Sequence, residues 1–184
     1  MFVISVKSIL NEFKYNNFSN FQEIEYGDKN YGIIIRLKNE KIDRGCIGFI
    51  KNLKTFEEAC RVASINAAFF DNRYKNITRK EFINLEIDIT ILGRWEKIET
   101  PISWDPQKNS LMVKYLNHRS ILQGQIMDEY NLNKKSFLKI LMRKANLALN
   151  SWKNPKYNYY KAYSIHKTLK VKKIINKYIP KNNW

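Results

Sequence analysis

The sequence predicts an α+β fold built on an antiparallel sheet. Helical and strand-like hydrophobic patterns are mixed along its 184 residues, and short turns link several of the strands. A chain of this length can form one domain with a proper core. A composition of 44% hydrophobic and 14% aromatic residues argues against a disordered chain.

The N-terminal part begins with an amphipathic segment and a first strand. Residues 1–14 place apolar side chains at helical spacing and form either a short helix or a strand. Polar residues at 16–20 and a turn signal at 26–30 lead into an apolar strand at 31–37. The polar residues at 38–41 then predict a turn before a second strand.

Two capping boxes mark the starts of helices. The motifs at 55–58 and 78–81 each place a Thr hydroxyl and a Glu carboxylate where they can satisfy unpaired N–H groups at a helix start. The first helix is expected to run to about Phe70 with an alanine-rich stripe facing a sheet, and the second to Asn84. Cys60 flanks that stripe and is interpreted as a packing residue.

Residues 85–107 predict a strand followed by irregular chain. Apolar and polar residues alternate at 85–92, which is typical of a half-buried strand. Asp88, on the polar side of this strand, would face either a polar cleft or solvent. Residues 93–107 are expected to be irregular, because two residues that precede proline disfavour helix there.

The C-terminal half predicts two further strands and three helices. Strands are expected at 110–116 and 159–165, and an amphipathic helix at 166–179. A third capping box predicts a helix at 120–130, and Asn133 can cap the next helix.

The run Arg44-Gly45-Cys46-Ile47-Gly48 is the most distinctive stretch of the chain. It follows the strand at 31–37 and is interpreted as a turn and the start of the second strand. Its two glycines indicate either positive φ or close backbone approach. Cys46 is then either a small buried hydrophobe in a tight turn or the reactive group of a site.

Three motifs resemble the AMMECR domain family, the AmmeMemoRadiSam system protein A group. The family signature reads Leu-Arg-Gly-Cys-Ile-Gly; Asp43 replaces its leucine, and the run 44–48 matches the rest. Residues 67–74 resemble the family's Ala-Ala-x-x-Asp-x-Arg-Phe, and residues 85–92 resemble its Leu-x-Ile-Glu-Val-Ser-x-Leu strand. The resemblance covers about residues 30–160.

This resemblance implies a particular architecture. A single domain over residues 1–165 would have two unequal lobes, each an antiparallel sheet with helices, and the larger lobe would hold both termini. The signature would face the groove between the lobes, and such grooves commonly bind ligands. Residues 166–184 would form a basic C-terminal helix or tail.

The resemblance also implies partners. These are a radical S-adenosylmethionine protein and a Memo-like protein of extradiol-dioxygenase ancestry. The domain would act with them either as an enzyme or as an adaptor that binds a substrate while the partners perform the chemistry.

The candidate site centres on Cys46, the candidate nucleophile, which needs a lowered pKa or an adjacent base such as His118. Arg44 and Arg73 would hold an anionic ligand, and Asp71 would orient one of them. Alternatively, Asp71 and Arg73 form a solvated ion pair at a helix end, which contributes little. The predicted ligand-binding residues are Arg44, Gly45, Ile47, Gly48, Asp71, Arg73 and Gln125, the last matching the glutamine of the family's Leu-Leu-Pro-Gln motif.

The charge of the chain suggests a second kind of partner. The net charge is +16, and residues 151–184 contain nine lysines and no acidic residue. Such a tail can bind weakly to phosphate backbones, with tyrosines stacking on bases, although codon bias toward lysine, asparagine and isoleucine would give the same composition. The tyrosines concerned, which could equally belong to a core strand, are Tyr157, Tyr159, Tyr160 and Tyr163.

Other classes of site are not indicated. The sequence has no Gly-rich phosphate loop and no Cys/His cluster, so neither a cofactor nor a metal site is predicted. Two cysteines are too few for a disulfide framework, which favours a reducing, cytoplasmic setting. No apolar run approaches the ~18 residues of a membrane span, and the N-terminus lacks a signal-peptide cleavage site.

Overall fold

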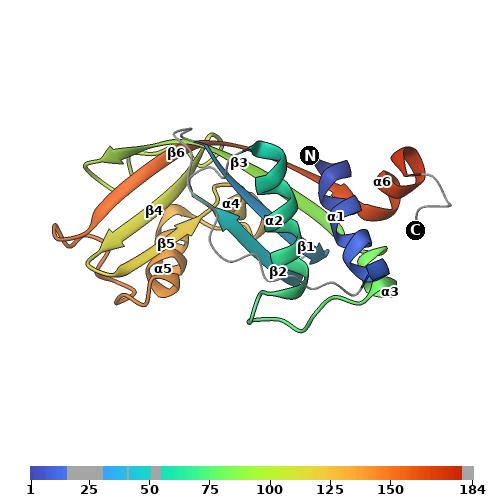
Figure 1. Ribbon diagram of the computed structural model, residues 1–184. Helices are drawn as coiled ribbons and strands as arrows, with labels where there is room; N and C mark the ends of the chain where they lie inside the picture. The colour runs from blue at the N-terminus through green and yellow to red at the C-terminus, as the bar shows by residue number, and fades with distance from the viewer. Residues whose placement is uncertain (16–30, 41, 51–54, 180–184) are drawn as a thin grey trace. The chain divides into compact units, whose positions relative to one another are not determined.

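The computed structural model describes residues 1–15, 31–40, 42–50 and 55–179, and its elements are shown in Figure 1. The turn predicted at 26–30 and the polar segment at 16–20 lie outside the described residues. The helices are α1 (Phe2–Tyr15), α2 (Phe56–Phe69), α3 (Arg79–Phe82), α4 (Ile126–Glu129), α5 (Lys134–Lys144) and α6 (Val171–Tyr178). The strands are β1 (Gly32–Asn39), β2 (Ile42–Phe49), β3 (Glu86–Ile98), β4 (Asn109–Tyr115), β5 (His118–Leu122) and β6 (Asn158–Lys170).

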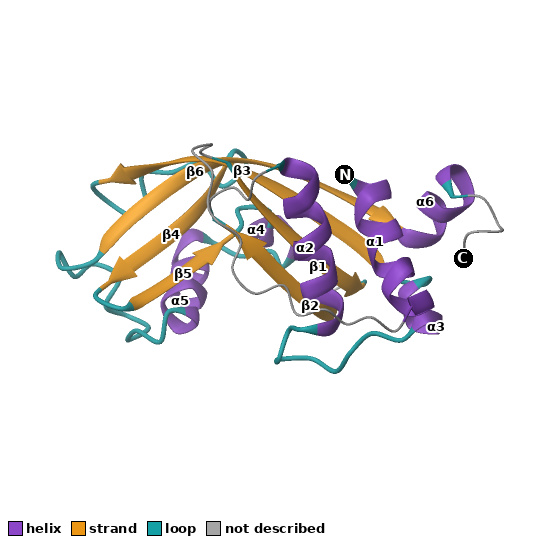
Figure 2. Cartoon of the chain, viewed as in Figure 1, coloured by secondary structure: helices purple, strands orange, loops and turns teal. Residues whose placement is uncertain are grey.

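Mixed helices and an antiparallel sheet confirm the predicted α+β class (Figure 2). The strands form one six-stranded sheet in the order β2-β1-β3-β6-β4-β5, in place of a separate sheet for each lobe. Contacts divide the chain into one unit of Met1–Ile91 with His166–Trp184 and a second of Leu92–Ile165. The first unit therefore contains both termini. None of the described helices has the length and apolar character needed to cross a membrane.

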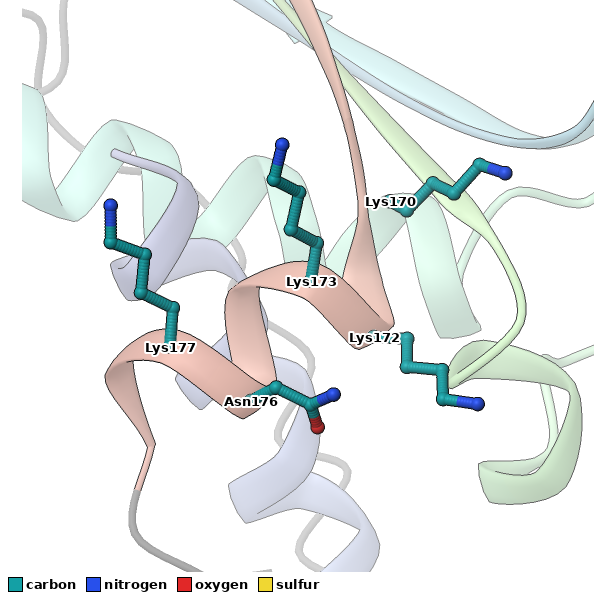
Figure 3. A pocket seen from close by; sticks show the side chains of 5 residues that line it. All are labelled: Lys170, Lys172, Lys173, Asn176 and Lys177. Carbon is teal, nitrogen blue, oxygen red and sulfur yellow. The ribbon is translucent and has the colours of Figure 1, made fainter.

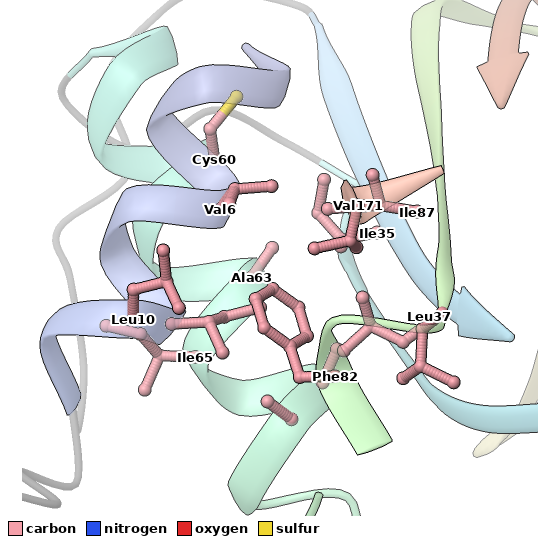
Figure 4. Close-up of a cluster of buried hydrophobic side chains, with 14 of the residues drawn as sticks. Val6, Leu10, Ile35, Leu37, Cys60, Ala63, Ile65, Phe82, Ile87 and Val171 are labelled. Carbon is pink, nitrogen blue, oxygen red and sulfur yellow. The ribbon is translucent and has the colours of Figure 1, made fainter. Parts of the chain in front are cut away.

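The core of the first unit lies between its helices and one face of β1 and β3. Figure 4 shows side chains from α1, α2, α3 and α6 packed against these strands. The helix alternative for residues 1–14 is confirmed, since Val6 and Leu10 of α1 are buried in this core. The caps Thr55 and Thr78 accept the N–H groups of residues three positions later, as predicted.

The core of the second unit lies between α5 and the strands β4 and β5. Asn133 caps α5 by accepting the Ser136 N–H, and Phe137 and Leu141 are fully buried. Tyr159 of β6 is also buried, and its hydroxyl donates to the Trp152 carbonyl. This tyrosine is therefore a core residue and is not available to stack on a base.

The strand predicted at 85–92 is present within β3, and the helices predicted at 120–130 and 166–179 are confirmed in part as α4 and α6, but four details of these predictions were wrong. Residues 93–98 continue β3, residues 120–122 belong to β5, and residues 166–170 continue β6. The alternating segment 85–92 is not half-buried: residues 87–90 are buried on both faces. At 93–98, 120–122 and 166–170, membership of the sheet overrides the local pattern.

Candidate functional site

The signature lies inside β2 and not at the turn that precedes it. β2 begins at Ile42, and the change of direction occurs near Glu40, which has a φ of 54°. The order of the sheet makes β2 an edge strand, paired with β1 through the register Arg36↔Cys46. The signature therefore lies in the second strand, as predicted, but the prediction that it also forms the turn was wrong.

Close backbone approach explains the two glycines. No described glycine has positive φ. A Cβ atom on Gly45 would lie 1.8 Å from the Ala67 carbonyl oxygen in α2, and one on Gly48 would lie 2.7 Å from the Ile33 carbonyl oxygen in β1. Gly45 therefore lets α2 pack directly on β2, and Ile47, on the same side, packs against the core of the first unit.

Both backbone groups of Cys46 are bound by side chains from the segment after α2. Asp71 accepts the Cys46 N–H at 2.8 Å, and Nη2 of Arg73 donates to the Cys46 carbonyl at 2.7 Å. Nε and Nη2 of Arg73 also bind the two carboxylate oxygens of Asp71 at 2.8 and 2.7 Å. The Asp71–Arg73 pair thus satisfies the backbone hydrogen-bonding groups of Cys46 that the free edge of β2 would otherwise leave unpaired. Asp71 is buried and is not part of a solvated ion pair.

These contacts determine the charge states of Asp71 and Arg73 beside Cys46. Burial alone would raise the pKa of Asp71, but the hydrogen bonds from Arg73 and from the Cys46 N–H outweigh it and lower that pKa. The hydrogen bond to Asp71 raises the pKa of Arg73. The Arg73 side chain is 53% exposed, and its guanidinium carbon lies 5.4 Å from the centre of the Tyr74 ring. A half-exposed cation is therefore held beside Cys46.

Asp71→Asn is expected to lower the free energy of unfolding by about 1–2 kcal/mol at pH 7, the lower range for charged hydrogen bonds because Arg73 is half exposed. The folded pKa of Asp71 lies below the unfolded value of about 3.9. The Asp71 carboxylate therefore contributes its full stabilisation of the folded state above about pH 4. This stabilisation is lost as the pH falls through the lower pKa of the folded protein. Urea unfolding of both proteins between pH 7 and pH 3 measures this difference. A difference that stays constant over that range would contradict the prediction.

Arg44 is engaged elsewhere. Its Nε donates to the Glu81 carboxylate of α3, and Nη2 donates to the Lys75 carbonyl at 3.3 Å. The hydrogen bond to Glu81 raises the pKa of Arg44. The second capping box thus supplies a carboxylate that ties β2 to α3, and the charge of Arg44 is balanced there.

Arg36 was missed by the sequence analysis. It lies opposite Cys46 in the β1–β2 register, is 1% exposed, and has Nε 3.6 Å from Asp88 and 3.5 Å from Asp43. Because Cys46 directs its N–H and carbonyl away from β1, this is the non-hydrogen-bonded kind of pair, whose side chains lie close on one face. A buried guanidinium therefore lies on the Cys46 face of the sheet. The signal in the sequence was a charged residue inside the apolar run 33–37.

Gln125, His118 and Cys60 complete the set of candidate residues. Gln125 belongs to the second unit, where it precedes α4, so its role at the signature stays a prediction. His118, also in the second unit, has Nδ1 3.0 Å from the Ala145 carbonyl. Cys60 is fully buried, and burial raises its pKa to about 11, which agrees with a packing role.

Comparison with protein-family models identifies one family. A family model described as AMMECR1 matches residues 3–166. A protein of Sulfurisphaera tokodaii is 32% identical over 120 residues, covering 61% of this chain and 52% of that protein, so the chain spans about half of that relative. A protein of Methanocella arvoryzae is 26% identical over 166 residues, covering 86% of this chain and 84% of that protein.

One solved structure supports the fold. The crystal structure of the uncharacterized protein PH0010 from Pyrococcus horikoshii matches 90% of this chain and 87% of its own, with a TM-score of 0.74 and 23% sequence identity. At that identity the likeness concerns the fold alone.

Proposed function

This chain belongs to the AMMECR1 family, and on that basis we propose that its signature strand binds a small anionic ligand, with Arg73 as the anchor and Cys46 as the thiol beside it. The observation that carries the proposal is the double contact to Cys46, whose N–H and carbonyl are both held by the Asp71–Arg73 pair. Binding both groups fixes the cysteine backbone, and therefore the direction of its side chain, next to a half-exposed guanidinium.

Of the three arginines near the signature, Arg73 is the one that we propose as the anchor for the anion. Arg44 is bound to Glu81, and Arg36 is buried with Asp88 and Asp43. Arg73 is more exposed than either, and among the described residues no hydrogen bond engages its Nη1. A carboxylate or phosphate oxygen could accept that N–H while Asp71 holds the guanidinium in place.

The test compares two alkylating reagents of similar size on the Cys60→Ala protein, so that Cys46 is the thiol that reacts. Iodoacetate is an anion and iodoacetamide is neutral, so the ratio of their rates measures how strongly the site attracts negative charge. A unit charge about 4 Å away contributes ~1 kcal/mol in water. We therefore expect Arg73→Gln to lower the iodoacetate-to-iodoacetamide ratio about fivefold, since 1.4 kcal/mol corresponds to tenfold.

Two further variants control this experiment. Arg73→Lys keeps the charge and should keep most of the ratio. Arg79→Gln removes the same charge from an exposed position of α3 and should leave the ratio unchanged. Inorganic phosphate should slow both reagents in the parent protein and not in Arg73→Gln. An unchanged rate ratio in Arg73→Gln would contradict the proposal, and so would the absence of alkylation before the protein unfolds. The function of the Asp71–Arg73 pair would then be to cover the edge strand β2.

The pH dependence of the same rate separates an enzyme from an adaptor. A free thiol titrates near about 8.5. A midpoint well below this value would identify an activated thiolate and favour acyl- or alkyl-transfer chemistry at Cys46. A normal midpoint, with a stable complex that survives Cys46→Ser, would favour an adaptor for the radical S-adenosylmethionine and Memo-like partners.

A further inference from the structure

Lysine side chains surround a hollow in the first unit where β6 ends and α6 begins. The hollow has a volume of about 470 Å³ and is lined by Lys170, Lys172, Lys173, Asn176 and Lys177 (Figure 3). Its lining contains four cationic side chains, one amide and no acidic side chain. The chemistry of the hollow therefore favours an anion.

A packed helix holds these lysines in place. Val171, Ile174 and Ile175 form the other side of α6 and are each at most 1% exposed. The Val171 N–H also donates to the Leu85 carbonyl at 2.9 Å, which fixes the start of the helix. The apolar side of α6 is therefore used in the protein core and is not available to enter a lipid bilayer.

The charge of these lysines is not balanced within the described part of the chain. Lys170, Lys172, Lys173 and Lys177 form no ion pair with any described acidic residue. Nζ of Lys177 lies 5.1 Å from the centre of the Tyr178 ring. Four unneutralised charges on eight residues of chain repel one another, and a bound polyanion would relieve this repulsion.

The directions of the side chains indicate an extended anion. Figure 3 shows Lys173 and Lys177 projecting to the same side of α6, as expected for residues four apart. Lys170 and Lys172 project in other directions. The four ammonium groups do not converge on one point, so they match a row of separated phosphates better than a single small anion.

We propose that this lysine face, Lys170, Lys172, Lys173 and Lys177, binds the phosphate backbone of nucleic acid without sequence preference. Lysine contacts to phosphates position a protein on nucleic acid but do not read bases. Each contact releases a counterion, so the logarithm of the binding constant falls with the logarithm of salt by about 0.9 per contact on duplex DNA. Four contacts give an expected slope of about −3.6.

The test is binding of a fluorescein-labelled 20-base-pair DNA duplex, followed by anisotropy between 50 and 200 mM salt. The first variant replaces the four lysines of the lysine face by glutamine. The control makes the same four-charge change at exposed lysines of other elements and loops, namely Lys75, Lys80, Lys97 and Lys139. We expect the first variant to weaken binding at least tenfold at 50 mM salt and to lose most of the slope, and the control to weaken it less than threefold.

Three outcomes would overturn the proposal. Equal loss in both variants would mean that the overall charge attracts DNA and that no site exists. Absence of DNA binding by the parent protein at 50 mM salt would also show that the lysine face is not a nucleic-acid site. Tighter binding to phosphatidylglycerol vesicles than to the duplex, dependent on the same four lysines, would assign the lysine face to an anionic membrane surface. Thermal unfolding of each variant confirms that the core side of α6 remains packed.

Discussion

Asp88→Ala is expected to lower the free energy of unfolding by about 3 kcal/mol or more, because it leaves a buried guanidinium with one carboxylate fewer. Arg36 and Asp88 are 1% and 2% exposed, and Nε of Arg36 lies 3.6 Å from the Asp88 carboxylate. Asp43 also contacts Arg36, but its side chain is 33% exposed and solvent weakens its field. Urea unfolding at pH 7 measures the loss.

Two comparisons separate this effect from general charge removal. Lys108→Gln breaks the pair of Lys108 with Asp105, whose side chains are 70% and 45% exposed, and should cost less than about 1 kcal/mol. The double change Arg36→Met with Asp88→Leu removes both buried charges and should recover most of the stability. A loss below about 1 kcal/mol for Asp88→Ala would show that Arg36 does not depend on this partner.

Local chemistry was predictable from the sequence and long-range pairing was not. The caps at Thr55, Thr78 and Asn133 were correct, since the groups they satisfy lie three residues away. Ser120 has the same type of pattern, yet its hydroxyl donates to the Leu141 carbonyl at 2.7 Å and its backbone pairs with Val113 of β4. Contacts with residues distant in the sequence, Leu141 and Val113, therefore place Ser120 in a strand.

The same distinction applies to the candidate site. The motif match drew attention to Cys46, Asp71 and Arg73, and the structure brings these three together. The hydrogen bond of Arg44 to Glu81 was not foreseen, because Glu81 lies 37 residues away. Arg36 was visible as a charge in an apolar strand, but only the β1–β2 register places it opposite Cys46. Register depends on the hydrogen bonding of the whole sheet and cannot be read from one strand.

Gly45→Ala is expected to lower the free energy of unfolding by about 3 kcal/mol or more, at or above the upper range for overpacked cores. The added Cβ would lie 1.8 Å from the Ala67 carbonyl oxygen and 2.8 Å from its carbon. Both are backbone atoms of α2, so no side-chain rotation relieves the clash, and α2 and β2 must move apart. Such a movement would also disturb the contacts of Asp71 and Arg73 with Cys46, because both residues follow α2 directly.

Gly93→Ala is the matched control, because the nearest atom to its added Cβ is the Tyr163 carbonyl oxygen at 3.4 Å, an ordinary contact. It should change stability by less than about 1 kcal/mol, since alanine also restricts the unfolded chain. Urea unfolding gives both free energies, and alkylation of Cys46 in the Cys60→Ala background gives the local effect. If Gly45→Ala costs no more than Gly93→Ala, α2 does not press on β2 at Gly45. The glycine of the signature would then require a reason other than close packing, such as the approach of a ligand to the strand.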